Sequence, residues 1–333
     1  MAKPMTYTAH TRAVLVLGLP LIGGHLGQVA IQITDTVMLG WYGVEALAAV
    51  VLASSYFFIL FIVGSGFAWA VMPMVAAAAE ADETVQIRRV TRMGMWLSFL
   101  FACAAIPLMV FSGPVLVMLG QEPALAAQAQ SYLSILGWGI IPALGVLVLK
   151  SYLAALEHTR IVLWMTLAAA VVNAALNYVL IFGHFGAPEL GVRGAAIASL
   201  VMHVLSLAVL VLYARAVFPE HALFQRLWRP DWGAFAQVFQ LGWPIGLTSL
   251  AESGLFIATA IMMGWLGTLP LAAHGIALQI ASLTFMIHLG LANAATVRAG
   301  RAHSRSDRVH LRRGGVVVIV LSVVFSAVTI FAF

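Results

Sequence analysis

Nine apolar runs, each long enough to cross a lipid bilayer as a helix, constrain this chain more than any other feature. A hydrocarbon core of about 30 Å requires about 20 apolar helical residues. Transmembrane β-strands instead alternate in polarity over about ten residues, and these runs are continuous. We therefore predict an all-α polytopic membrane protein. The runs cover 13–39, 45–78, 93–119, 130–156, 161–183, 192–216, 234–264, 269–297 and 314–333.

The composition excludes a soluble domain. Of 333 residues, 62% are hydrophobic and 9% are charged, whereas soluble domains carry about 25% charged residues. The net charge of +5 does not indicate nucleic-acid binding, because the basic residues lie between the apolar runs. The only cysteine, Cys103, excludes an internal disulfide. It lies inside an apolar run, where we expect it to be a packing residue.

Basic residues gather in alternate connections, which predicts the orientation of the chain. The connections at 80–92, 157–160, 218–232 and 298–313 are charged, whereas 42–45, 120–124, 183–190 and 267–270 are short or nearly free of Lys and Arg. Arg193 falls on the second side, and Lys150 lies inside the fourth run, where it can extend toward the charged end. The positive-inside rule then places the N-terminus in the cytoplasm. The 15 basic residues on the first side, of 17 in all, are Lys3, Arg12, Arg88, Arg89, Arg92, Arg160, Arg215, Arg226, Arg229, Arg298, Arg301, Arg305, Arg308, Arg312 and Arg313.

Two stretches that lie 224 residues apart resemble each other. "MLGWYGVEALAA" at 38–49 matches "MMGWLGTLPLAA" at 262–273 at seven of twelve positions, and Pro20 pairs with Pro244 at the same spacing. Six runs precede the second copy, so both halves begin on the same side of the membrane. Such a parallel repeat is typical of two-lobed transporters. We predict a six-helix lobe at 1–216, a cytoplasmic linker at 217–233, and an incomplete three-helix lobe at 234–333 that lacks three further helices.

Few ionisable or amide groups lie at membrane depth, and such groups indicate functional sites. Asp35 lies toward the outer end of its run and Glu252 near the middle of another. Asn173 and Asn177 are four residues apart and share one helix face. With the predicted topology, Asp35 and both asparagines lie at similar depth, where they can form one site for a proton or a small cation. The alternatives are an Asp35 at the lipid interface and asparagines that only hold helices together.

Other chemistry is weakly supported. The aromatic residues Trp41, Tyr56, Phe61 and Tyr178 can line a cavity for organic cations or belong to the core and interface belts. The histidines His25, His203, His274 and His288 are scattered. No His-Glu-x-x-His, Cys-x-x-Cys or glycine-rich phosphate loop is present, so we expect neither a metal enzyme nor a nucleotide-driven pump.

Several motifs in combination resemble the multidrug and toxic compound extrusion (MATE) family, in its NorM-like branch. They are "ITDTVMLGWYG" at 33–43, "MPMVAAAAE" at 72–80, "NAALNYVLIFG" at 173–183 followed by "ELGVRGAAIAS", and "LGWPIGLTSLAESGLF" at 241–256. The resemblance extends over essentially the whole chain. It implies a two-lobed, parallel-repeat MATE-type transporter fold, with about nine transmembrane helices present of an expected twelve.

The resemblance also implies an activity and a set of site residues. It implies a monomeric antiporter of the inner membrane that exports cationic or amphipathic organic compounds in exchange for Na⁺ or H⁺, without another cofactor and without nucleic acid. Asp35, Asn173, Asn177 and Glu252 match the family positions with proposed coupling-ion roles. The family's acidic residue on the tenth helix has no counterpart here.

Three rivals remain open. A lipid-linked precursor flippase of the same superfamily would carry basic residues in its cavity, and these runs are nearly free of Lys and Arg. A membrane-embedded enzyme would need a nucleophile–base pair or a metal set within the runs. A scaffold protein would not explain acidic residues at membrane depth.

Overall fold

The computed structural model describes residues 5–266 and 268–332, apart from the side chains of a group of residues between 257 and 280 and of residues 331 and 332. Every regular element in this part of the chain is helical, as predicted. Short 3₁₀ turns (η1 Gly137–Gly139, η2 His184–Gly186 and η3 Pro219–His221) join some of the longer helices. The α-helices are α1 Tyr7–Tyr42, α2 Val44–Glu80, α3 Thr84–Val110, α4 Ser112–Met118, α5 Pro123–Leu136, α6 Ile140–Ala155, α7 Thr159–Phe182, α8 Val192–Val217, α9 Trp232–Leu266, α10 Thr268–Ser304 and α11 Arg308–Ala332.

The predicted membrane spans correspond to these helices. Within the described residues, seven segments are long and apolar enough to cross a membrane: 7–42, 44–80, 84–110, 123–155, 159–182, 192–217 and 308–330. The fourth of these joins α5, η1 and α6. The expected runs at 234–264 and 269–297 correspond to α9 and α10, which have 35 and 37 residues.

Two boundaries differ from prediction for physical reasons. The run at 93–119 is divided at Phe111 into α3 and α4, a break that continuous hydropathy does not reveal. Conversely, α3 begins at Thr84, so Arg88, Arg89 and Arg92 lie on a helix rather than in a loop. Apolar content marks the part of a helix that lies in lipid, and it misses the turns that continue into water.

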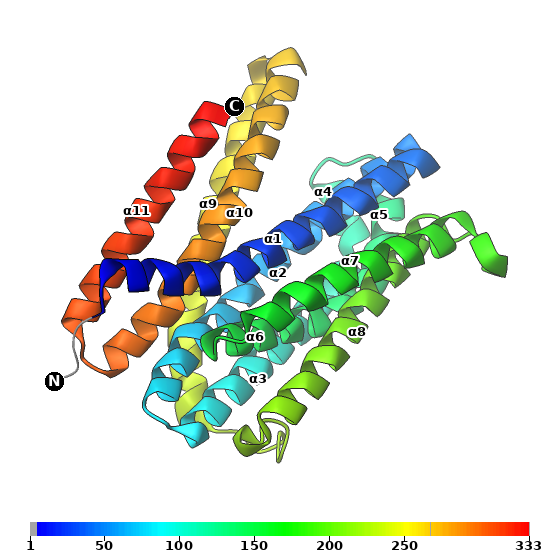
Figure 1. The fold of residues 1–333 in the computed structure, drawn as a ribbon. Helices are drawn as coiled ribbons and strands as arrows, with labels where there is room; N and C mark the ends of the chain where they lie inside the picture. The colour runs from blue at the N-terminus through cyan, green and yellow to red at the C-terminus, as the bar shows by residue number, and fades with distance from the viewer. Residues whose placement is uncertain (1–4, 267, 333) are drawn as a thin grey trace.

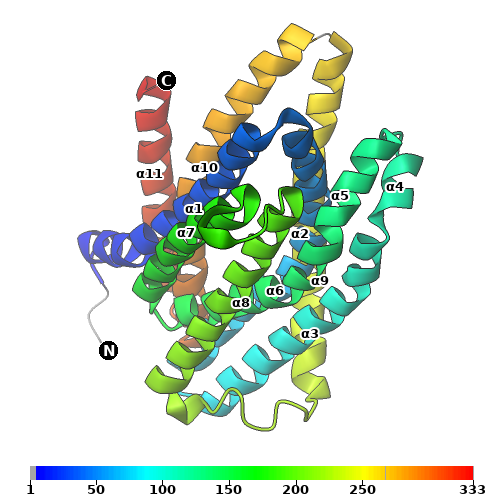
Figure 2. The same cartoon turned by 90° about the vertical axis from the view of Figure 1, so that its right-hand side faces the viewer.

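The long hairpins of the two halves pack against each other crosswise. Helix α2 packs against α9, and α1 packs against α10, while α6 lies inside the first bundle with most of its residues buried. In Figure 1 the lower parts of α2 and α9 run together, whereas the far ends of the α1–α2 and α9–α10 hairpins point apart. Figure 2 shows α3, α6 and α8 side by side in the first bundle.

The internal repeat is visible in the helix boundaries. Helices α1 and α9 end at residues 42 and 266, α2 and α10 span 44–80 and 268–304, and α3 and α11 begin at 84 and 308. Each pair is separated by the 224 residues that relate the two sequence copies. The structure therefore repeats three consecutive helices in the same order and direction.

Glycines make the same inter-hairpin contact twice. A Cβ atom on Gly66 of α2 would overlap the backbone of Gly242 and Gly246 on α9, and one on Gly290 of α10 would lie 2.8 Å from the backbone nitrogen of Ile22 on α1. Gly290 is the repeat equivalent of Gly66, and Ile22 is that of Gly246. Because small residues let membrane helices approach closely, these positions fix how tightly the two hairpin pairs meet.

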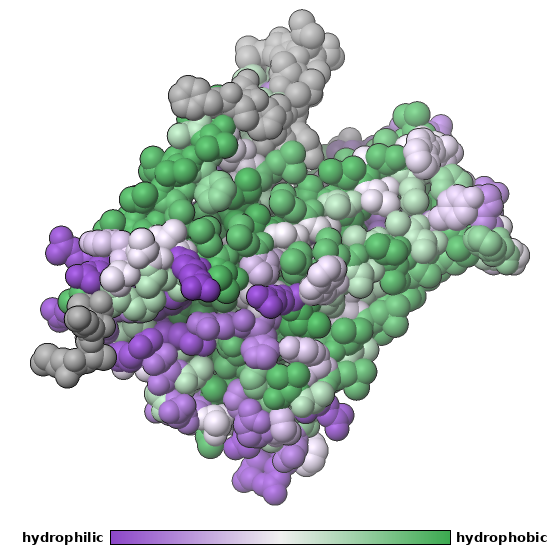
Figure 3. All heavy atoms as spheres, viewed as in Figure 1, coloured by the Kyte–Doolittle hydropathy of each residue, from purple (hydrophilic) through white to green (hydrophobic). Residues whose placement is uncertain are grey.

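Ion pairs join the two halves at one end, which we call the basic end because the charged connections lie there. Arg301 of α10 pairs with Glu157 at 3.1 Å, and Arg305 pairs with Glu80 at 3.0 Å. Figure 3 shows hydrophilic side chains at this end and apolar ones over the helices above it. The halves are thus held together at the basic end.

The segment between α8 and α9 lies against α3. Arg92 donates to the carbonyl of Leu223 at 2.8 Å, Trp96 donates to that of Leu227 at 2.6 Å, and Arg89 forms an ion pair with Asp231. The hydrogen bond from Arg89 holds the pKa of the Asp231 carboxyl below its ordinary value. The predicted lobe boundaries at 216 and 234 stay predictions, and this segment is attached to the first of the two lobes.

Candidate functional site

The structure brings Asp35 together with both predicted asparagines. Asp35 lies in the last third of α1, and Asn173 and Asn177 lie one turn apart on α7, which packs along α1. Both asparagines are fully buried. The Nδ2 atoms of both donate hydrogen bonds to the same oxygen of Asp35, Oδ1. The expectation that the three share one depth and one location is confirmed, and their roles stay predictions.

The site has more oxygen atoms than internal donors. The Oδ1 atoms of Asn173 and Asn177 are buried and have no hydrogen-bond partner in the described part of the chain. The neighbouring hydroxyls do not supply one, since Thr34 and Thr36 donate to backbone carbonyls of their own helix. Buried oxygens of this kind are costly unless a proton, cation or water satisfies them. A carboxylate with two amide oxygens is a ligand set for a hard cation or a proton.

Tyr132 is a residue of this site that sequence reasoning missed. It lies on α5, is 3% exposed, and interacts electrostatically with Asp35. Its hydroxyl lies near the side chains of Ser54 on α2 and Ser199 on α8. No spacing in the sequence connects Tyr132 with Asp35, because the proximity of the two residues depends on how α5 is rotated.

Glu252 is separate from this group. It lies on α9, is exposed, and forms neither a hydrogen bond nor an ion pair with any described residue. Glu252 therefore takes no part in the Asp35 site in this structure.

The four predicted aromatic residues lie apart. Trp41 is 73% exposed at the end of α1, and Tyr178 stacks on His184 with ring centroids 4.3 Å apart. Tyr56 donates to the carbonyl of Leu108 at 3.1 Å. Tyr56 and Phe61 are both partly buried and pack against one apolar cluster of the first bundle. Among the described rings, no stacking contact joins any two of the four. A shared aromatic cavity stays a prediction.

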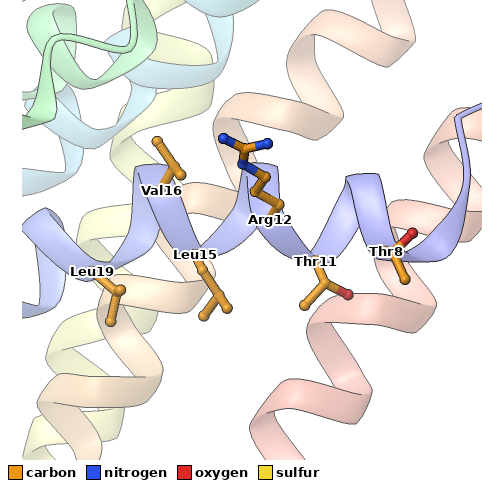
Figure 4. Close-up of a pocket in the computed structure, with 6 residues that line it drawn as sticks. All are labelled: Thr8, Thr11, Arg12, Leu15, Val16 and Leu19. Carbon is orange, nitrogen blue, oxygen red and sulfur yellow. The ribbon is translucent and has the colours of Figure 1, made fainter.

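Two further features lie away from Asp35. Cys103 is exposed on α3 rather than packed inside the protein, which corrects that expectation. A shallow hollow runs along the beginning of α1 (Figure 4). All of its lining residues belong to α1. Of these, Leu19 lies nearest to Asp35 in sequence, 16 positions before it, which is roughly 24 Å along a helix. The residues that line it are Thr8, Thr11, Arg12, Leu15, Val16 and Leu19.

A protein-family model shows which family this chain belongs to. The MatE model matches residues 20–179 and again 244–333, and the two matches begin 224 residues apart. The chain belongs to the MatE family. Because one model matches twice, it also confirms the internal repeat in this MatE protein.

Relatives and solved structures agree with this assignment. The chain is 49% identical over 331 residues to the "Probable multidrug resistance protein NorM" of Rhizobium meliloti (strain 1021), covering 98% of this chain and 71% of the relative. It is 45% identical to the protein of the same name from Agrobacterium fabrum, covering 94% and 68%.

The fold is that of solved MATE proteins. A eukaryotic MATE transporter superposes with a TM-score of 0.85 at 20% identity, covering 95% of this chain and 70% of that one. A MOP superfamily transporter from Pyrococcus furiosus superposes with a TM-score of 0.84 at 19% identity, covering 96% and 70%. The predicted fold class is confirmed, and this MatE protein is a multi-pass membrane protein.

Proposed function

We propose that this MatE protein is a secondary multidrug efflux transporter that exports cationic or amphipathic organic compounds in exchange for Na⁺ or H⁺. The names of its relatives support the efflux activity. The coupling proposal rests on one observation, the partly buried Asp35 held by two fully buried asparagines that each keep an unpaired oxygen.

In this proposal the first half binds the coupling ion. The Asp35 carboxylate supplies the negative charge, and the amide oxygens of Asn173 and Asn177 complete the coordination of Na⁺ or accept from a protonated carboxyl. Neutralising Asp35 changes the charge between α1 and α7, which biases one arrangement of the helices over another. The cargo in this scheme is a small organic cation, and the working unit is a monomer.

The proposal is tested by ethidium efflux from cells or vesicles under an imposed Na⁺ or H⁺ gradient. Asp35→Asn keeps the shape of the side chain and removes its charge, so gradient-driven efflux should be lost while ethidium binding survives in part. Asp82→Asn is the matched control, because Asp82 lies in the turn between α2 and α3. A surface-expressed Asp35→Asn protein that exports ethidium at the unmodified rate would show that Asp35 has no part in coupling.

We further propose a plasma-membrane location with the N-terminus in the cytoplasm. The basic end supports this orientation through the positive-inside rule. In a Cys103→Ser background, Arg312→Cys should be shielded from a membrane-impermeant maleimide in intact cells, whereas Glu122→Cys should react. Both positions are exposed, so the opposite pattern would reverse the orientation.

A further inference from the structure

Lys150 is a cation in the middle of the first bundle without an acidic partner. It lies on α6, five residues before that helix ends at Ala155. Its Nζ lies 3.5 Å from Oε1 of Gln28 in the central part of α1, and its expected extension toward the basic end stays a prediction. None of the ion pairs among the described residues includes Lys150. A charge at membrane depth is costly and therefore indicates a function.

Two imidazoles lie on the helices that contact α6 here. His25 lies three residues before Gln28 on the same face of α1, and His203 lies on α8, which packs against α6; both are near enough to be influenced by the charge of Lys150. The Nε2 atom of His25 lies 3.0 Å from Nδ2 of Asn293 on α10, so the second half of the protein also contributes. Lys150, His25 and His203 are only partly buried and Gln28 is exposed. This group of four residues, which we call the Lys150 cluster, is accessible to a ligand.

The cluster continues a polar stripe that leads to Asp35. On α1, polar residues recur at 25, 28, 32 and 35, the spacing of a single helix face. Gln28 and Asp35 are seven residues apart, which is two turns or roughly 10 Å along the helix. The ammonium of Lys150, beside Gln28, and the carboxylate of Asp35 therefore mark a cationic and an anionic position along one face of α1, at a fixed separation.

We propose that the Lys150 cluster binds the carboxylate of an organic ligand. The ammonium has three donor hydrogens, of which Gln28 accepts at most one, and the ring nitrogens of His203 have no hydrogen-bond partner among the described residues. Hydrogen bonds from a cation to a carboxylate are stronger than those between neutral groups. The inference rests on the proposed efflux function and deepens it, because it adds an anion-binding position to a site expected to take cations.

A matched pair of dyes tests this inference. Rhodamine 110 carries a free carboxylate, and rhodamine 123 is its methyl ester and lacks that charge. Binding of each dye is measured by fluorescence anisotropy to the full chain in phosphatidylcholine nanodiscs, which avoids anionic lipid. Lys150→Gln should weaken rhodamine 110 binding at least about ten-fold, the scale of one charge-assisted hydrogen bond, and change rhodamine 123 binding less than two-fold.

Two variants serve as controls. Lys150→Arg keeps the charge and should keep rhodamine 110 binding. Arg193→Gln removes an exposed basic residue on another helix and should change neither dye. If Lys150→Gln does not fold, His203→Gln replaces it, with a smaller selective loss of rhodamine 110 expected.

The outcomes separate this inference from the efflux proposal. An equal effect of Lys150→Gln on both dyes, or no effect on either, overturns the carboxylate site. An unmodified protein that binds rhodamine 123 but rejects rhodamine 110 also overturns it, while the efflux proposal stands. A protein that binds neither dye contradicts the efflux proposal, and the carboxylate site with it.

Discussion

Asn173 and Asn177 contribute to the candidate site through one hydrogen bond each. Asn173→Ala and Asn177→Ala should each weaken ion-driven efflux less than Asp35→Asn does. Each removes one amide donor to Asp35 and one candidate ligand oxygen but leaves the charge of Asp35 in place; the lost hydrogen bond alone is worth on the order of 1 kcal/mol, or roughly five-fold in an equilibrium constant. Initial rates of ethidium efflux at several ion concentrations measure this, with Gln128→Ala as a control because Gln128 is an exposed amide residue on α5. An asparagine variant as inactive as Asp35→Asn would give that residue an essential role of its own.

The residue scale also shows what the sequence can predict. Asp35, Asn173 and Asn177 could be grouped in advance because depth follows from counting residues along helices of known direction. The environment of Lys150 could not be predicted, since the direction of a long side chain depends on the rotation of α6 against α1 and α8. Rotation is set by packing between helices, and one sequence does not reveal it. Tyr132 was missed for the same reason.

At the scale of helices, the glycine contacts predict an asymmetry along α9. Gly246→Ala would place a Cβ atom against the carbonyl oxygen of Val63 on α2, whereas the Cβ atom of Gly254→Ala would meet no atom of the described residues within 4 Å. Overpacking of this kind typically costs about 1–3 kcal/mol. Thermal unfolding in detergent should therefore show a lower midpoint for Gly246→Ala and an unchanged or higher one for Gly254→Ala.

The two glycine variants share a helix and a chemical change, so they differ only in what faces them. Equal midpoints for both would mean that α2 and α9 are not in close contact in the folded protein.

Helix boundaries were predicted less well than helix existence. Hydropathy alone placed Arg88, Arg89 and Arg92 in a loop and did not detect the break at Phe111.

For the whole molecule, the ion pairs at the basic end predict how its two halves separate. Glu80→Gln combined with Glu157→Gln removes the acidic partners of Arg305 and Arg301. Partly exposed pairs contribute about 0.2–1 kcal/mol each, so the double variant should shift the equilibrium between closed and open basic ends by roughly two- to thirty-fold. Spin labels at Asp82→Cys and Arg312→Cys, in a Cys103→Ser background, report the separation by double electron–electron resonance.

The expected result is a larger population at long label separation in the double variant. Glu122→Gln is the control, because Glu122 forms no ion pair with any described residue and lies at the opposite end. An unchanged distance distribution would show that apolar packing, rather than charge, holds the basic end closed.

The crosswise packing of the hairpins also has a consequence for synthesis. The faces of α1 and α2 that receive α10 and α9 leave the ribosome about 261 and 188 residues before their partners, which is roughly 10–50 s at ordinary translation rates. During that interval Ile22 and Gly66 have only lipid, or the insertion machinery, against them. A ribosome that stalls inside the α8–α9 connection would therefore leave a first half whose most closely packed surface is bare.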